Sequence, residues 1–146
     1  MDKDLDLKNS KKKKETSKTI HHVRIAYEDQ FAVEIMNGVV QKTDNLNFRM
    51  QTPRCYGFYT KTTCAAFYTK IIRYNFKLCP ISDVYGIMYH KEKIGEGRFY
   101  LGMIPLECSD GGYRILTFKI DRESTLRIGT VLADNIDNHS MFLLRS

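Results

Sequence analysis

The feature that most constrains the fold of this chain is a succession of short strand-like runs from residue 23 onwards. β-Branched and aromatic residues form runs of a few residues, and Gly, Asn or Asp separates one run from the next. In residues 23–27 every second side chain is apolar, which is the pattern of a half-buried strand. Residues 31–36, which precede an Asn-Gly turn pair, and residues 46–50 alternate in the same way. These runs predict a mainly β protein.

The second half of the chain predicts two hairpins and a last strand. Residues 98–106 are nearly all apolar, and we expect them to pair with residues 84–90 across a glycine-containing turn. Residues 113–120 and 125–132 form the second expected hairpin. Residues 141–144 are apolar, and we expect them to be an edge strand that completes the sheet.

One stretch has a helical period instead. Apolar or large side chains recur at steps of three and four residues, which predicts one short helix near residues 62–77; they are Cys64, Phe67, Tyr68, Ile71, Ile72 and Asn75. Thr62 or Thr63 is suited to cap its N-terminus. A strand in this place would put Lys70 on an apolar face, so we favour the helix.

Strands, one helix and further strands predict a β-barrel or a β-sandwich. The five-stranded oligonucleotide/oligosaccharide-binding (OB) barrel has a similar order of elements, so an OB-like architecture is one form of this prediction. The chain has 146 residues, of which 42% are hydrophobic, and this suits one core. We expect residues 1–22, which lack aromatic side chains, to be a disordered basic tail. Residues 23–146 then form a single β-rich domain.

The cysteines and the hydropathy exclude several classes of protein. No run of 18 apolar residues and no charged-then-apolar start occurs, so we expect neither a membrane partner nor a secretory signal. No two cysteines form a CxxC pair, which disfavours a zinc site. We therefore expect structural thiols in a reducing compartment and no metal site, with the cysteines at Cys55, Cys64, Cys79 and Cys108.

The formal charge of +6 is concentrated in two places. The tail has a net charge of +3 and contains the run Lys11–Lys14. Residues 45–82 contain no acid and have a net charge of +6, whereas the other parts of the chain are slightly acidic. The six basic residues of this segment are Arg49, Arg54, Lys61, Lys70, Arg73 and Lys77.

The same segment contains eight of the 17 aromatic residues. Cations that follow phosphates, with rings that stack on unpaired bases, are typical of surfaces for single-stranded nucleic acid. Phe67 and Phe76 are expected inside, because tyrosine tolerates partial exposure better than phenylalanine. The predicted nucleic-acid-binding residues are Arg49, Arg54, Tyr56, Tyr59, Lys61, Lys70, Arg73 and Tyr74. Contact with an acidic protein, or a plain core under a solvated face, is the alternative interpretation of this segment.

No set of residues predicts catalysis. Two of the four histidines, His21 and His22, adjoin the tail, and His90 is expected to be exposed at the end of a strand. The Gly-x-Gly at 95–97 and the Asp-Gly-Gly at 110–112 are typical of turns rather than of cofactor or ion sites. We therefore expect a protein that is not an enzyme and has no cofactor.

The leading hypothesis from the sequence is a domain that binds single-stranded DNA or RNA with low sequence specificity. The run Lys11–Lys14 is one form of nuclear import signal, so we expect a nuclear protein, with the cytoplasm as the alternative. A role as an accessory subunit of a nuclear complex is one form of this hypothesis. A second hypothesis is a protein-interaction module. It would dock through an exposed strand edge such as residues 98–106, or through the apolar residues 141–144.

Overall fold

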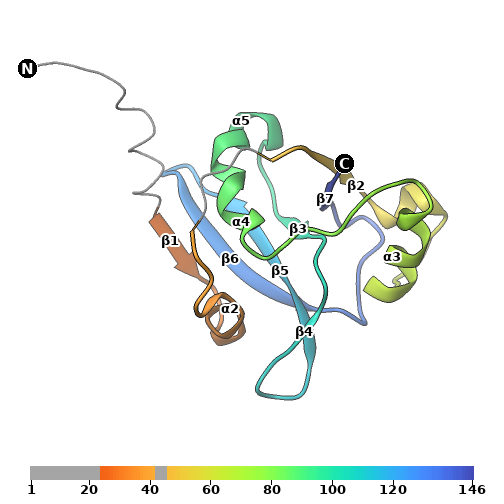
Figure 1. Cartoon of the computed structure of the whole chain (residues 1–146), viewed down its shortest axis with the longest axis horizontal. Coiled ribbons are helices and arrows are strands. Elements are labelled where there is room, and N and C mark those ends of the chain that lie inside the picture. The colour runs from red at the N-terminus through yellow and green to blue at the C-terminus, as the bar shows by residue number, and fades with distance from the viewer. Residues whose placement is uncertain (1–23, 42–45) are drawn as a thin grey trace, which may run out of the picture.

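The computed structural model describes residues 24–41 and 46–146, and its main feature is one mixed β-sheet (Figure 1). The strands follow the order β1-β6-β5-β3-β7-β2, and β4 pairs with β5 beside this path. β1 is parallel to β6 and β3 is parallel to β7, while the other pairs are antiparallel. The strands are Arg24–Tyr27 (β1), Phe48–Gln51 (β2), Phe99–Leu101 (β3), Leu106–Glu107 (β4), Tyr113–Ile120 (β5), Thr125–Leu132 (β6) and Phe142–Arg145 (β7).

The sheet is open, because within the described residues no pairing joins its edge strands β1 and β2. The prediction of a mainly β protein is confirmed, whereas the closed barrel, including its OB-like form, is not. The parallel pairs β1–β6 and β3–β7 need long crossover connections, which no hairpin pattern in the sequence predicts. The predicted tail, residues 1–22, and its lysine run lie outside the described residues.

The hairpin of β5 and β6 is the longest pairing in the sheet, and it is confirmed as predicted. Its register runs from Arg114 opposite Leu132 to Ile120 opposite Leu126. The turn is stabilised by the carboxylate of Asp121, which accepts hydrogen bonds from backbone N–H groups within the turn. Two runs rich in β-branched and other apolar residues on both sides of a polar turn made this hairpin predictable from the sequence.

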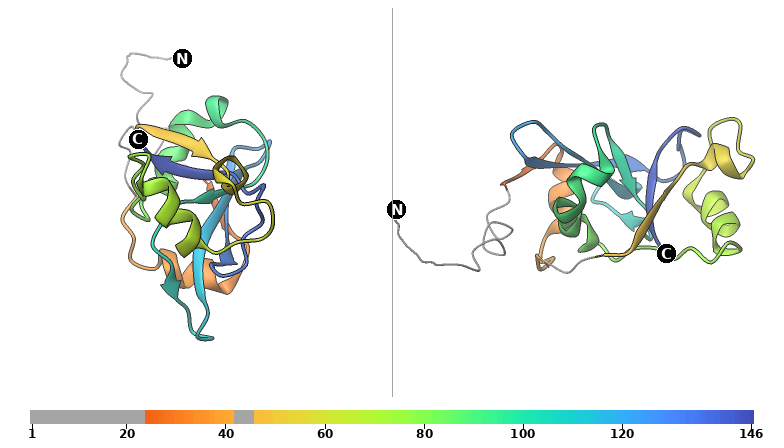
Figure 2. Two further views of the ribbon diagram at one scale, coloured as in Figure 1. Left: turned by 90° about the vertical axis from the view of Figure 1, so that its right-hand side faces the viewer. Right: turned by 90° about the horizontal axis from the view of Figure 1, so that it is seen from above.

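Short helices lie beside the sheet: Gln30–Met36 (α2), Cys64–Ile72 (α3), Asp83–Gly86 (α4) and Lys91–Ile94 (α5), with 3-10 turns at Pro53–Tyr56 (η1) and Ile87–His90 (η2). In the two views of Figure 2, α2, α4 and α5 lie to one side of the β5–β6 hairpin. α3 and η1 lie at the end of the molecule opposite β1 (Figure 1). The chain is thus helical in more places than the single predicted helix.

Residues 31–36 were predicted to be a strand, and this prediction is wrong. They belong to α2, whose N-terminus is capped by Asp29: its Oδ1 accepts a hydrogen bond from the N–H of Ala32 at 2.8 Å. The buried side chains of α2 are Ala32, Ile35 and Met36, which share one face of a helix. The apolar residues of this segment fit both the two-residue period of a strand and the 3.6-residue period of a helix. The Asp29 cap and packing against β1 and β6 favour the helix.

Residues 84–90 are a second correction. They were predicted to pair with residues 98–106, but they form the end of α4 and all of η2. Val84 and Tyr85 are both buried although they are neighbours, which a half-buried strand does not allow. β3 pairs instead with β5 and β7.

The C-terminal strand β7 lies inside the sheet, so its predicted place at an edge is wrong. It is paired with β3 on one side and β2 on the other, and Phe142, Leu143 and Leu144 are fully buried. A Cβ atom at Gly102 would collide with Leu144 and approach the carbonyl oxygen of Leu143 to 2.9 Å. Phe142, Leu143 and Leu144 are therefore covered within the sheet, whereas Ile104, in the expected docking segment 98–106, is exposed. The outermost strands of the sheet path are β1 and β2.

Candidate functional site

The predicted nucleic-acid-binding residues lie on β2, η1, α3 and the adjoining loops, at one end of the molecule (Figure 1). Arg49 is on β2, and η1 carries Arg54 and Tyr56. The remaining residues follow along the chain: Tyr59 and Lys61 before α3, Lys70 within it, and Arg73 and Tyr74 directly after it. We call these eight residues the basic end.

The turn η1 exposes Arg54 because its two termini are fixed. Thr52 Oγ1 accepts a hydrogen bond from the N–H of Cys55 at 3.4 Å, and Pro53 occupies the first position. Gly57 ends the turn with φ of 94°, a left-handed conformation that favours glycine. Pro53 is buried and Arg54 is exposed, so the turn presents its cation to solvent.

The helix α3 confirms the helix predicted near residues 62–77, although it ends earlier, at Ile72. Thr63 caps it, because its Oγ1 accepts a hydrogen bond from the N–H of Ala66 at 3.1 Å. Its buried side chains include Phe67 and Ile71, which lie four residues apart on the face that packs into the core. Arg73 then closes the last turn.

Aromatic contacts join η1 to α3. The ring of Tyr56 lies edge-on to Phe67 at 6.1 Å and to Tyr74 at 5.1 Å between centroids. Tyr56 Oη donates a hydrogen bond to Gln51 Oε1 at 2.8 Å. Burial raises the pKa of Tyr56, and the charge of Arg49 opposes this rise. Arg49, Tyr56 and Tyr74 are therefore neighbours, as the prediction of one site requires.

A distant loop holds the segment between η1 and α3 in place. Thr62 and Ile136 exchange both backbone hydrogen bonds at 2.8 Å. The N–H of Arg54 donates to the carbonyl oxygen of Asn138, and Asn138 Nδ2 donates to that of Phe58 at 3.3 Å. These long-range contacts fix the backbone beneath the cations. The same loop brings Asp134 and Asp137 to the border of the basic end.

The rings of the basic end differ in exposure. The exposed fractions of Tyr59 and Tyr74 are 72% and 58%, whereas Tyr56 is half-buried. Phe67 is fully buried, as predicted, and Phe76 is half-buried. The rings of Tyr59 and Tyr74 are therefore accessible to solvent, and Tyr56 packs edge-on against Tyr74.

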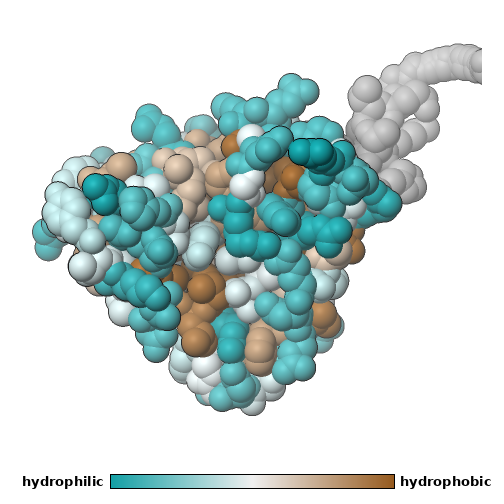
Figure 3. Space-filling view, turned by 180° about the vertical axis from the view of Figure 1, so that it is seen from behind, coloured by the Kyte–Doolittle hydropathy of each residue, from teal (hydrophilic) through white to brown (hydrophobic). Residues whose placement is uncertain are grey.

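The cations of the basic end are not neutralised by neighbouring acids. Four of them are exposed and Lys70 is half-buried. Within residues 24–41 and 46–146, none of the five makes an ion pair with a carboxylate. Arginines elsewhere do, in the pairs Arg98–Glu28, Arg114–Asp110, Arg127–Asp121 and Arg145–Asp83. Seen from behind, this end is on the left of Figure 3, where hydrophilic groups cover most of the surface.

Three of the four thiols are buried, and the fourth is exposed. Burial raises the pKa of Cys64 to about 11, and burial is also the main cause that raises the pKa of Cys79. Cys108 is buried as well, and Cys55 is exposed. Burial of Cys64 agrees with its predicted structural role. In the described part of the chain, no group of three His, Cys, Asp or Glu side chains is arranged to hold a metal ion.

His90 differs from its prediction as an exposed side chain at a strand end. It ends η2, and its ring lies edge-on to Phe48 at 5.0 Å between centroids. Its Nε2 is buried and has no hydrogen-bond partner among the described residues. Burial lowers the pKa of His90, and the charge of Lys93 lowers it further.

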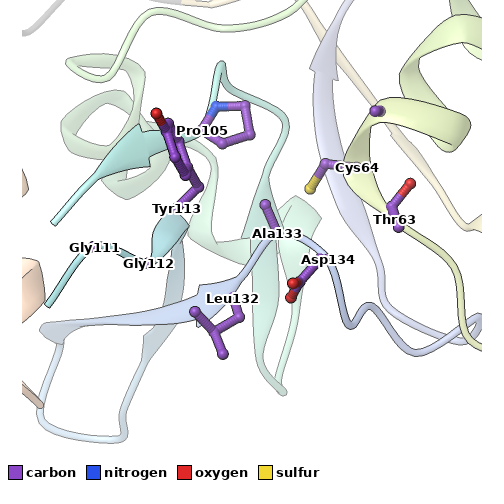
Figure 4. Close-up of a pocket in the computed structure, with 10 residues that line it drawn as sticks. Thr63, Cys64, Pro105, Gly111, Gly112, Tyr113, Leu132, Ala133 and Asp134 are labelled. Carbon is purple, nitrogen blue, oxygen red and sulfur yellow. The ribbon is translucent and has the colours of Figure 1, made fainter.

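A pocket of about 540 Å³ lies beside the N-terminus of α3, and no pattern in the sequence predicted it. In Figure 4, Tyr113 and Pro105 lie together on one side, Thr63 and Cys64 lie on the other, and Asp134 is between them. The residues that line it lie at α3, the start of β5 and the end of β6. Because these segments are far apart in the sequence, no local motif predicts the pocket. The outward position of Tyr113 at a strand end was the one available signal.

Comparison with protein-family models gives no match, and comparisons with curated proteins and with solved structures give none either. Among the described residues, no helix is long and apolar enough to cross a membrane. The basic end and the pocket are therefore the two features on which a function can be argued.

Proposed function

We propose that this protein binds single-stranded nucleic acid, DNA or RNA, through the basic end, with low sequence specificity and without catalysing a reaction. The observation that carries the proposal is a set of five cations on β2, η1, α3 and the adjoining loops that lack acidic partners within the described residues, with two exposed tyrosine rings in the same segment. Unpaired cations attract a polyanion more strongly than cations already held in ion pairs, because no local carboxylate has to be displaced.

The exposed rings favour a single strand over a duplex. The rings of Tyr59 and Tyr74 are exposed, and unpaired bases stack on exposed rings, whereas paired bases are covered by their neighbours. Stacking contributes about 1–3 kcal/mol per base and is tolerant of sequence. Flexible lysine and arginine side chains that follow phosphates add affinity without reading base edges. Low specificity follows from both contributions.

The experiment compares two variants that remove the same number of charges. The test variant is Arg54→Ala, Lys61→Ala and Arg73→Ala together. The control is Lys91→Ala, Lys119→Ala and Arg122→Ala, which removes cations around η2 and the β5–β6 turn, away from α3 (Figure 1). Fluorescence anisotropy with a labelled oligonucleotide at low salt measures the affinity of each.

We expect the test variant to lose at least about tenfold in affinity, because each cation neutralises a phosphate. The control variant should lose much less, since only its long-range charge is changed. Equal losses in the two variants would move the binding surface away from the basic end. Circular dichroism of both variants checks that the fold is retained.

A further inference from the structure

The pocket beside α3 has a composition that the basic end lacks. Its walls are mostly apolar, formed by Cys64, Ala65, Pro105, Leu132 and Ala133. Tyr113 is 55% exposed, so its ring is accessible at the pocket. Asp134 supplies a carboxylate, and its side chain makes no hydrogen bond or ion pair within the described residues. The pocket thus offers apolar walls, one accessible ring and one free acceptor group.

We propose that this pocket receives a single unpaired base that carries an exocyclic amino group. The ring of Tyr113 would lie against the base, and the carboxylate of Asp134 would accept a hydrogen bond from the amino group. A volume of about 540 Å³ is in the range of pockets for small ligands. This inference rests on the proposed function, because the base arrives as part of a bound strand.

The position of the pocket relative to the basic end supports this occupant. Lys61 belongs to the basic end, and Thr63 lines the pocket only two residues later, which is at most about 7 Å of chain. A strand whose phosphates contact Lys61 is therefore close enough to place a neighbouring base in the pocket. Asp134 repels phosphate, so the base rather than the backbone faces it. Apolar walls match the flat surface of a base.

The inference predicts a preference among pyrimidines. Cytosine has an amino group at the position where uracil has a carbonyl oxygen, and the two bases otherwise match in size. A carboxylate accepts a hydrogen bond from the amino group, whereas it repels the carbonyl oxygen. The protein should therefore bind oligo(dC) more tightly than oligo(dU) of the same length, by about tenfold.

The test measures the affinity of the full chain and of two variants for labelled oligo(dC) and oligo(dU). Asp134→Ala should abolish the preference, because oligo(dC) loses its hydrogen bond to the carboxylate and oligo(dU) is no longer repelled by it. Tyr113→Ala should weaken both ligands, and Tyr113→Phe should restore them, because the ring rather than the hydroxyl is used.

The possible outcomes separate this inference from the proposed function. Tight and equal binding of both oligonucleotides by the wild-type protein would overturn the pocket inference and leave the basic end as the binding surface. A preference for oligo(dC) that persists in Asp134→Ala would also overturn it. If neither oligonucleotide binds at low salt, the proposed function fails, and the pocket inference fails with it.

Discussion

His90 shows how one side chain can make the stability of this fold depend on pH. Its Nε2 is buried beside Phe48 without a hydrogen-bond partner among the described residues, and Lys93 adds a positive charge nearby. Both surroundings disfavour the protonated ring, so the pKa of His90 in the folded protein is below its ordinary value. The unfolded chain, where this environment is lost, takes up the proton first as the pH falls.

The free energy of unfolding should therefore decrease as the pH falls from about 7.5 through the ordinary histidine pKa of about 6.5. His90→Phe keeps a ring against Phe48 and removes the titrating group. We expect this variant to lose less stability between about pH 7.5 and about pH 5 than the wild type does. Urea denaturation at a series of pH values measures the difference.

His139→Gln, which removes an exposed histidine, is the control. It shows how much the pH dependence of stability changes when a histidine outside the buried site is lost. Identical pH dependence in the wild type and in His90→Phe would show that the buried ring does not contribute to it.

At the scale of elements, a helix was predictable where its capping residue and the spacing of its apolar residues agree. The helix α3 was predictable because Thr63 and the spacing of its apolar residues agree. For α2, the alternation over residues 31–36 outweighed the capping signal of Asp29, which was present in the sequence. Asp29 also accepts hydrogen bonds from Thr130 of β6, a contact between residues 101 positions apart. No local pattern predicts such a contact.

The cap of α3 provides a prediction for one element. Thr63→Ala removes the hydrogen bond to the N–H of Ala66 and should lower the free energy of unfolding by about 1 kcal/mol. Thr63→Ser keeps an oxygen in the same place and should retain most of the stability. Thermal denaturation of the two variants makes the comparison, and equal melting temperatures for alanine and serine would contradict the capping role.

The candidate site was predictable in part for a related reason. The absence of acids from residues 45–82 is visible in the sequence, and β2, η1 and α3 are close along the chain. The contacts of Thr62 with Ile136 and of Arg54 with Asn138 join segments about eighty residues apart, and they bring Asp134 to the site. The pocket depends on these contacts, so it became visible only in the folded structure.

At the scale of the whole molecule, the C-terminal strand holds the sheet together. β7 joins β3 to β2, and its three apolar residues are fully buried. Loss of each buried side chain of this size costs about 2–5 kcal/mol, and the stability of a small domain is only about 5–15 kcal/mol. The apolar end of the chain is thus explained by folding rather than by docking.

Deletion of residues 141–146 should therefore unfold the protein, with loss of the cooperative thermal transition. Deletion of the exposed Ser146 alone is the control and should leave the transition in place. A shortened protein that lacks 141–146 and still unfolds cooperatively near the wild-type temperature would show that β7 is dispensable for the sheet.

The charges of the molecule are neutralised unevenly within the described residues. Four arginines are paired with Glu28, Asp83, Asp110 and Asp121, whereas the cations near η1 and α3 make no ion pair with an acid there, and neither do Arg24, Lys91, Lys119 and Arg122 elsewhere. This uneven neutralisation is the physical basis of the proposed function. It implies that binding is driven by the release of counterions from phosphates.

The most direct test is the affinity of the wild-type protein for a labelled single-stranded oligonucleotide over a series of salt concentrations. If three to five cations neutralise phosphates, the logarithm of the association constant should fall linearly with the logarithm of the salt concentration, with a slope of about −2 to −3.5. No binding at low salt, or an affinity that does not change with salt, would contradict the account.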